Sequence, residues 1–388
     1  MKLLLVSSRF PWPPWRGNQL RTLQWLDALA DHERLLICPS TADQAEPLDR
    51  DVELRFFPGV GVASVIGVGA AVLAGRPAQE GLYGSSAGKE IVAEVVRDWR
   101  PDAAVIQMVR CGWATDVVRQ VDPGLPVIFD AIDSMSLHYL KAAESAGGLM
   151  RTVYRWEAER CRSRESELVA AAATSTAVSG RDLRALGAGA RGMVVTVAGG
   201  AEVTQVDPSS AEPIVLLSGN LGYRPTVRSA LWFAGSIWPR IRDRTPGARL
   251  ILAGARPAKA VQRLGSEPGI EVFGDVDDLG AFLARARVSI APMASGSGVP
   301  IKILEALAAG VPVVADPWSA DGLEDPSAVM VAETEEAWVE NVSLLLDDPL
   351  AAQHQAASGT EVWRAFYAPE RVAAQIRGAV DAAISRSR

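Results

Sequence analysis

Short aliphatic or β-branched runs alternate with helical patterns along the whole chain, and this alternation constrains the fold more than any other feature. Seven such runs fall in the first half and six in the second. A parallel strand needs a crossover connection, usually a helix, before the next one, so the pattern predicts parallel sheets covered by helices. The predicted strands are 2–7, 35–39, 52–57, 103–107, 126–129, 174–178 and 193–197, then 214–218, 249–253, 270–273, 288–291, 311–315 and 328–331.

The length of the chain predicts two domains, because 388 residues exceed what one hydrophobic core usually organises. Residues 199–213 are polar, contain Gly, Ser and Pro, and lack periodicity, so we predict a linker there. The fold class is therefore α/β, with two Rossmann-like, doubly wound domains, 1–198 and 214–368, facing each other across a cleft. We expect a last helix, 369–388, to pack back on the first domain.

Charge and cysteine usage restrict the partners and the compartment. The net charge is -7 and the basic residues are scattered, which argues against a nucleic-acid surface and favours small-molecule partners. Cys38, Cys111 and Cys161 are far apart and cannot all pair, as in a reducing compartment. The first residues form no signal-peptide core of normal length, so we predict a cytoplasmic protein.

Residues 59–75 form an uncharged, apolar run interrupted by five glycines. The run is short for a membrane span, and we predict a buried or cleft-facing helix. The alternative is a surface that meets the inner face of a membrane or a lipid-linked acceptor, because an exposed apolar run is costly without a partner.

The sharpest candidate for chemistry is a Ser/Gly loop that follows the strand 288–291 and leads into a helix predicted over 300–309, with Gly310 after its end. Lys302 and Glu305 share one face of this helix. Beside a loop without bulky side chains, Lys302 would neutralise a diphosphate and Glu305 would accept hydrogen bonds from ribose hydroxyls. The alternative is an exposed ion pair worth about 0.2–0.5 kcal/mol.

Two further turns join a strand to a helix. In the turn that contains Gly219 and Asn220, Arg224 lies just before a predicted helix start, where a cation is unfavourable unless an anion is bound. Gly17 precedes the first long helix and would let the backbone approach the phosphate of a bound nucleotide, as of a donor substrate, or a second, acceptor substrate. A single glycine in a loop is more often only a turn.

Asp130 and Asp133 follow the strand 126–129, and either would contact an acceptor hydroxyl or cap a helix; both readings stay open. The three histidines show no ligand spacing, so we predict no metal site and no cofactor.

Four motifs, in this order and spacing, resemble the group 1 (GT4-like) glycosyltransferases of the GT-B fold. They lie at 219–225, 249–254, 272–279 and 302–314. More weakly, residues 129–134 and 151–167 look like a sugar-transferase branch found with exopolysaccharide genes.

The resemblance implies retaining transfer of a sugar from a nucleotide diphosphate donor to the hydroxyl, or a similar nucleophile, of a small-molecule or lipid-linked acceptor, with the leaving diphosphate helping to take the acceptor proton. Glu305 matches the glutamate that holds the donor ribose, and Lys302 and Arg224 fall where basic residues meet the diphosphate. By the same resemblance the donor sugar and base are lined by Gly296, Ser297 and Gly298, and by Phe273 through Val276.

The chain also departs from the family pattern. Ser297 replaces the first glutamate of the usual pair, and the N-terminal histidine often seen in the class has no clear match, so that Asp133 is the candidate for a related place. The predicted catalytic residues are thus Asp133, Lys302 and Glu305. The rival functions are a nucleotide-sugar epimerase of the same fold, which would use more histidines and carboxylates, and a degenerate nucleotide-sugar-binding homologue.

Overall fold

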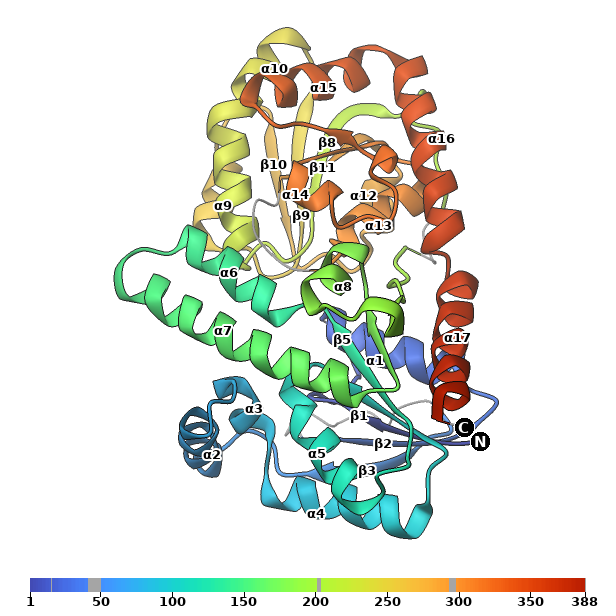
Figure 1. The fold of residues 1–388 in the computed structure, drawn as a ribbon. Coiled ribbons are helices and arrows are strands. Elements are labelled where there is room, and N and C mark those ends of the chain that lie inside the picture. The colour runs from blue at the N-terminus through green and yellow to red at the C-terminus, as the bar shows by residue number, and fades with distance from the viewer. Residues whose placement is uncertain (15, 41–49, 201–203, 293–297, 388) are drawn as a thin grey trace. The chain divides into compact units, whose positions relative to one another are not determined.

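A computed structural model describes residues 1–14, 16–40, 50–200, 204–292 and 298–387. The chain forms two compact units, one of Met1–Val197 with Val372–Arg388 and one of Ala198–Arg371. Each unit is a parallel sheet flanked by helices (Figure 1). The predicted α/β class with two doubly wound sheets is confirmed, and each predicted strand overlaps an observed one.

The sheet of the first unit has the strand order β3-β2-β1-β4-β5-β6-β7. Its central strands are mostly apolar and almost entirely buried, as expected for a parallel sheet covered on both faces. The order reverses at β1, whose neighbours are β2 and β4. The strands are β1 (Lys2–Val6), β2 (Glu33–Pro39), β3 (Glu53–Phe57), β4 (Ala103–Gln107), β5 (Val127–Ile132), β6 (Thr174–Ala177) and β7 (Gly192–Val194).

Helices connect these strands, and side-chain caps begin several of them; Ser134, for example, accepts from the Leu137 amide at the start of α6. The α-helices of this unit are α1 (Gly17–Ala28), α2 (Val62–Leu73), α3 (Ala78–Tyr83), α4 (Ser86–Glu94), α5 (Gly112–Val121), α6 (Met135–Ser145), α7 (Gly148–Ala171), α8 (Gly180–Leu186) and the last helix, α17 (Pro369–Ser387).

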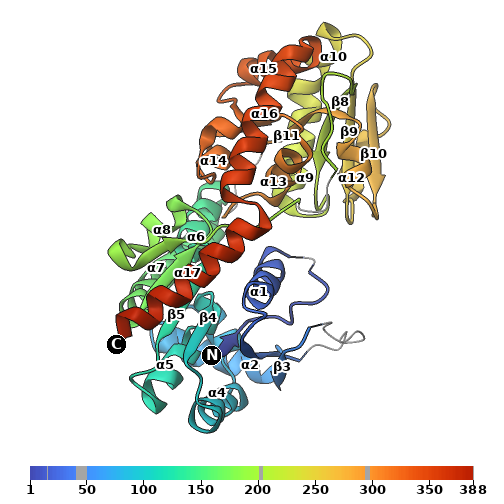
Figure 2. The same cartoon turned by 90° about the vertical axis from the view of Figure 1, so that its right-hand side faces the viewer.

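The last helix lies along the first unit (Figure 2). Gln375 accepts a hydrogen bond from the Thr196 amide at 2.8 Å, and Arg377 donates to the carbonyl of Ala28 at 3.0 Å. Val372, Ile376 and other apolar residues of α17 are buried.

A buried ion pair fixes the centre of this unit. Arg21 on α1 donates its Nε and Nη2 to the two carboxylate oxygens of Asp130 at 3.1 and 2.9 Å, and both side chains are fully buried. Thr176 and Gln107 also donate to Asp130. Asp130 is therefore occupied by structural partners.

The sheet of the second unit has the order β10-β9-β8-β11-β12-β13 and reverses between β8 and β11. Its strands are β8 (Glu212–Ser218), β9 (Arg249–Gly254), β10 (Ile270–Gly274), β11 (Ala286–Ala291), β12 (Val313–Ala315) and β13 (Met330–Val331). Its helices are α9 (Arg224–Trp232), α10 (Trp238–Arg244), α11 (Lys259–Leu264), α12 (Gly280–Leu283), α13 (Ile301–Ala309), α14 (Pro317–Ala320), α15 (Glu335–Asp347) and α16 (Pro349–Phe366).

The prediction of a helix within residues 59–75 is confirmed by α2, but of the two predicted placements, buried or cleft-facing, the buried one was wrong. Val65, Ile66 and Leu73 are 71%, 76% and 91% exposed. The helix packs on α3 through a narrow glycine contact, because a Cβ on Gly67 would lie 2.4 Å from the Gly81 carbonyl oxygen. This contact covers one side only, and the other side stays apolar and open. Within the described residues, no helix is long and apolar enough to cross a membrane.

Candidate functional site

Two loops meet at the point where the strand order of the second sheet reverses. One follows β8 and contains Gly219, and the other follows β11 and leads into α13. Open α/β sheets bind ligands at the carboxyl ends of their strands at such a reversal. The helix α13 begins after Pro300 and ends at Gly310, which adopts the left-handed conformation at φ 73°. Its first turn carries Lys302.

Lys302 lies against Gly219. A Cβ placed on Gly219 would be 3.5 Å from the Lys302 Cε and 3.7 Å from its Nζ, and Gly219 has a φ of 120°. Glycine is needed at this turn because an L side chain rarely adopts that φ. A neighbouring glycine is equally constrained, since a Cβ on Gly254 would lie 1.8 Å from the Gly219 carbonyl oxygen. These glycines bring the ends of β8 and β9 together beside the ammonium group.

The surroundings of Lys302 disfavour its charged form. Burial lowers the pKa of Lys302 to about 8, while Glu305 and Asp316 act in the opposite direction. Burial likewise raises the pKa of Glu305, and Lys302 opposes that shift. Both side chains are only partly accessible, so the alternative of an exposed surface pair was wrong. A buried cation at a strand-order reversal is suited to hold an anion.

The other predicted donor residues of this unit are spread over several loops. Asn220 accepts a hydrogen bond from the Gly222 amide at 3.0 Å, and Arg224 is exposed at the first position of α9. Phe273, 36% exposed at the end of β10, packs on Phe282 with ring centroids 5.0 Å apart.

The remaining predicted donor residues lie in two loops. Val276, shortly after β10, is half-buried, and Gly298, shortly before α13, has a φ of 70°. Gly296 and Ser297 lie outside the described residues.

Residues 212–348, most of the second unit, match the family model for glycosyl transferases group 1. This segment is therefore similar to a group 1 glycosyltransferase domain. The resemblance seen in the motifs is thereby confirmed. Comparison with curated protein sequences found no significant match.

Solved glycosyltransferase structures share the fold over the whole chain. Sucrose-phosphate synthase from Thermosynechococcus elongatus superposes with a TM-score of 0.71 at 15% identity, covering 98% of both chains. Anabaena HepE in complex with UDP and glucose gives a TM-score of 0.66 at 12% identity, covering 98% of this chain and 99% of that one. WaaG, a glycosyltransferase involved in lipopolysaccharide biosynthesis, gives 0.62 at 16% identity, with 97% and 100% covered. The chain therefore has the GT-B architecture.

The first unit contains the remaining predicted residues, Gly17 and Asp133. Gly17 is the exposed first residue of α1. Asp133 follows Ile132, which has a left-handed φ of 64° that is unusual for a β-branched residue. Burial lowers the pKa of His138, and the nearby Asp133 carboxylate raises it. Asp133 and His138 thus share the carboxyl end of β5.

Three residues at this edge escaped sequence reasoning: Arg9, Arg110 and His138. Each lies three to six residues beyond the end of a parallel strand, and this position could have marked them as candidates for ligand contact.

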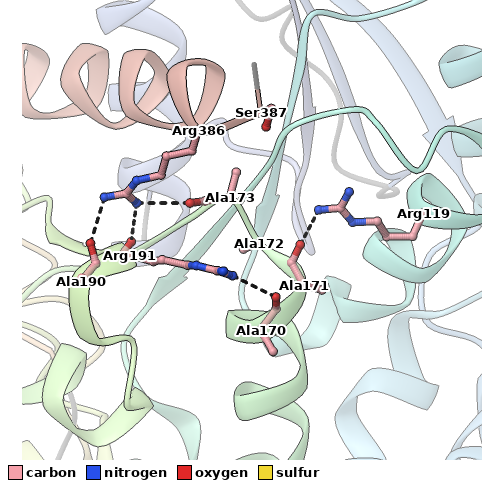
Figure 3. Close-up of a pocket in the computed structure, with 9 residues that line it drawn as sticks. All are labelled: Arg119, Ala170, Ala171, Ala172, Ala173, Ala190, Arg191, Arg386 and Ser387. Carbon is pink, nitrogen blue, oxygen red and sulfur yellow. Dashed lines mark hydrogen bonds between the residues drawn. The ribbon is translucent and has the colours of Figure 1, made fainter.

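A separate pocket of about 550 Å³ lies at the opposite, amino-terminal edge of the first unit's sheet (Figure 3). Arg386 donates to the carbonyls of Ala190 and Ala173 at 2.9 and 3.2 Å, and Arg191 donates to that of Ala170 at 3.3 Å. Arg119 donates to the carbonyl of Ala171. Backbone acceptors thus engage the arginines of this pocket and join the end of α7 to α17, which assigns it a structural role.

Proposed function

We propose that the protein is a retaining glycosyltransferase that transfers a sugar from a nucleotide diphosphate sugar to an acceptor hydroxyl, with the donor bound by the second unit and the acceptor by the first. The observation that carries the proposal is the partly buried Lys302 beside Gly219 at the strand-order reversal. The group 1 match over residues 212–348 supports it, and a similar structure contains UDP and glucose.

In the proposed reaction, the bond between the sugar's anomeric carbon and the diphosphate oxygen breaks, and a bond to the acceptor oxygen forms on the same face. The acceptor proton passes to the leaving diphosphate. Lys302 stabilises the negative charge on that diphosphate, as fixed cations do in phosphate-leaving reactions. We propose that Arg224 assists it, that Glu305 holds the ribose, and that no metal or other cofactor takes part.

We test the donor site by thermal unfolding of the wild type with UDP, GDP, dTDP and ADP. A nucleotide at about 100 times its dissociation constant adds roughly 2.7 kcal/mol of apparent stability. We expect one nucleotide to raise the wild-type melting temperature and to lose that effect in Lys302→Ala and Glu305→Ala. No shift by any nucleotide would remove the main support for transfer. A shift without turnover of the matching nucleotide sugar would favour the degenerate homologue.

We also propose a cytoplasmic location with peripheral contact to an anionic membrane surface, made by the exposed apolar side of α2 and the start of α7. Leu149, Val153 and Trp156 of α7 are 78%, 41% and 43% exposed. Arg160 links the two helices: its guanidinium carbon lies 3.6 Å from the Trp156 ring centroid, and it donates to the Val72 carbonyl at 2.8 Å.

The charge of this surface fits acidic lipids. Residues 149–156 contain two exposed arginines and no acidic residue. An apolar helix with flanking arginines and a tryptophan is typical of helices that lie in the membrane interface. We expect sedimentation with vesicles containing phosphatidylglycerol, and less with phosphatidylcholine alone. Leu73→Asp should abolish it without lowering stability; unchanged sedimentation would contradict the proposal.

A further inference from the structure

The carboxyl edge of the first sheet carries a cluster of arginines where its strand order reverses. Arg9 lies three residues beyond the end of β1 and Arg110 three residues beyond the end of β4, and these two strands are neighbours. Arg16 is the N-cap residue of α1, directly after the loop that follows β1. The first unit therefore places its basic residues where the second unit places Lys302, at the reversal of the strand order.

Neighbouring side chains hold these arginines in place. Arg110 donates its Nε to Gln79 Oε1 at 2.7 Å, and its guanidinium carbon lies 5.8 Å from the Tyr83 ring centroid. Tyr83 also hydrogen-bonds Arg9. The residue before the 3-10 turn that contains Arg110, Met108, has a φ of 64°, a strained conformation for a side chain of this type. The backbone thus fixes the direction from which Arg110 approaches.

Several buried donors in the same connection lack an acceptor. The Nε of Arg9, the Oγ of Ser8 and the Nδ2 of Asn18 are inaccessible to water and have no hydrogen-bond partner among the residues that the structure describes. Leaving a buried polar group unpaired is costly, and each such group calls for an explanation. A bound anion would supply the acceptor that the Arg9 Nε needs.

The electrostatics of the cluster agree with this. Burial lowers the pKa of Arg9, as do the nearby charges of Arg16 and Arg110, while Tyr83 acts in the opposite direction. Like charges that share a small volume repel each other unless an anion lies between them. The arginines of the pocket in Figure 3 differ, because their guanidinium groups already donate to backbone carbonyls.

The arginine cluster also borders Asp133 and His138. Burial lowers the pKa of His138, Asp133 raises it and Arg110 lowers it, so the carboxylate and the guanidinium both lie within electrostatic reach of the imidazole. An anion held by the arginines would therefore be close to the carboxylate and imidazole at the end of β5.

We propose that Arg9, Arg16 and Arg110 bind a phosphate group carried by the acceptor, and thereby place the acceptor hydroxyl near Asp133. Arginine suits this role because its planar fork donates two hydrogen bonds to phosphate oxygens. The proposal rests on the proposed function, in which the first unit binds the acceptor. The phosphate belongs either to a soluble sugar phosphate or to a lipid-linked one, and both share this chemistry.

The test measures binding to the full chain by calorimetry, with glucose 6-phosphate, inorganic phosphate and glucose as probes. We expect the two phosphate compounds to bind the wild type, glucose not to bind, and Arg9→Gln and Arg110→Gln each to weaken phosphate binding at least about tenfold. Arg9→Lys should weaken it less. Arg191→Gln, which removes an exposed arginine from the opposite edge of the same sheet, is the matched control and should bind as the wild type does.

UDP binding, measured on the same variants, separates the donor from the acceptor. We expect its dissociation constant to change less than twofold in Arg9→Gln and Arg110→Gln. A tenfold loss of UDP binding with no phosphate binding would overturn the proposal and assign the arginines to the donor. If UDP fails to bind the wild type while phosphate binds through Arg9, the proposed function fails and the anion site stands.

Vesicles distinguish the two sources of phosphate. Phosphatidic acid in a phosphatidylcholine vesicle should displace inorganic phosphate if the acceptor is lipid-linked, and glucose 6-phosphate alone should do so if it is soluble. Either result supports a phosphate-bearing acceptor. Phosphate binding that is unchanged in both arginine variants overturns it.

Discussion

Raising the pH from 7 to 9 should weaken the binding of a nucleoside diphosphate about tenfold. In the ligand-free protein, burial lowers the pKa of Lys302 to about 8, so this side chain loses its charge over that range. A bound diphosphate favours the charged form and raises the pKa again. The observed dissociation constant is then multiplied by a factor of one plus ten to the power of the pH minus 8. This factor grows from about 1.1 at pH 7 to about 11 at pH 9, which weakens the binding free energy by roughly 1.4 kcal/mol.

Calorimetric titration with the nucleotide found by thermal unfolding, at pH 7, 8 and 9, measures this dependence. The terminal phosphate of the nucleotide loses its last proton near pH 6, so its charge stays nearly constant between pH 7 and 9. Lys302→Arg is the control, because a guanidinium stays charged, and its affinity should not change with pH. A wild-type affinity that varies less than twofold, or an equal slope in Lys302→Arg, would refute the assignment of Lys302 to the diphosphate.

The same shift bears on stability. Between pH 8 and about 10.4, the unfolded chain keeps the Lys302 proton that the folded protein has lost. The unfolding free energy of the wild type should therefore rise with pH relative to that of Lys302→Met. Denaturant titrations that show no such rise would contradict the burial of this charge. Arg21→Met should cost roughly 3–5 kcal/mol by leaving Asp130 buried and unpaired, and Arg21→Met with Asp130→Leu should recover part of the loss in urea unfolding. Gly254→Ala should destabilise the second unit by at least about 2 kcal/mol, since its Cβ would meet the Gly219 carbonyl; a near-wild-type melting temperature would show that the turn adapts. Arg386→Ala should lower stability by roughly 1 kcal/mol and leave nucleotide binding unchanged, because its bonds join backbone carbonyls of the first unit, whereas Lys302 belongs to the second.

Much of the fold was predictable because its signals are local. Aliphatic or β-branched runs of four to six residues marked the strands. The helix α13 could be predicted over nearly its observed length, since Pro300 and Gly310 act on the backbone at their own positions. The pairing of Lys302 with Gly219 was also within reach, because both follow strands that a doubly wound order places next to each other.

The remaining features depend on packing that no local pattern contains. The helix α2 is apolar, and only the narrow contact of Gly67 with α3 decides that its other side stays exposed. The approach of Arg9 to Arg110 requires that β1 and β4 are neighbours, although about a hundred residues separate them. The pairing of Arg21 with Asp130 likewise joins distant segments. Their sequence neighbourhoods contain nothing that indicates these contacts.

The central claim is that Lys302 and Glu305 serve the transfer of a sugar from a nucleotide diphosphate donor. Proton NMR of the protein with an α-linked nucleotide sugar tests this directly, because transfer to water releases free sugar and nucleoside diphosphate. We predict that the sugar appears first as the α anomer, and that its release stops in Lys302→Ala. Release that is equally fast in Lys302→Ala, or a β anomer as the first product, would contradict the account.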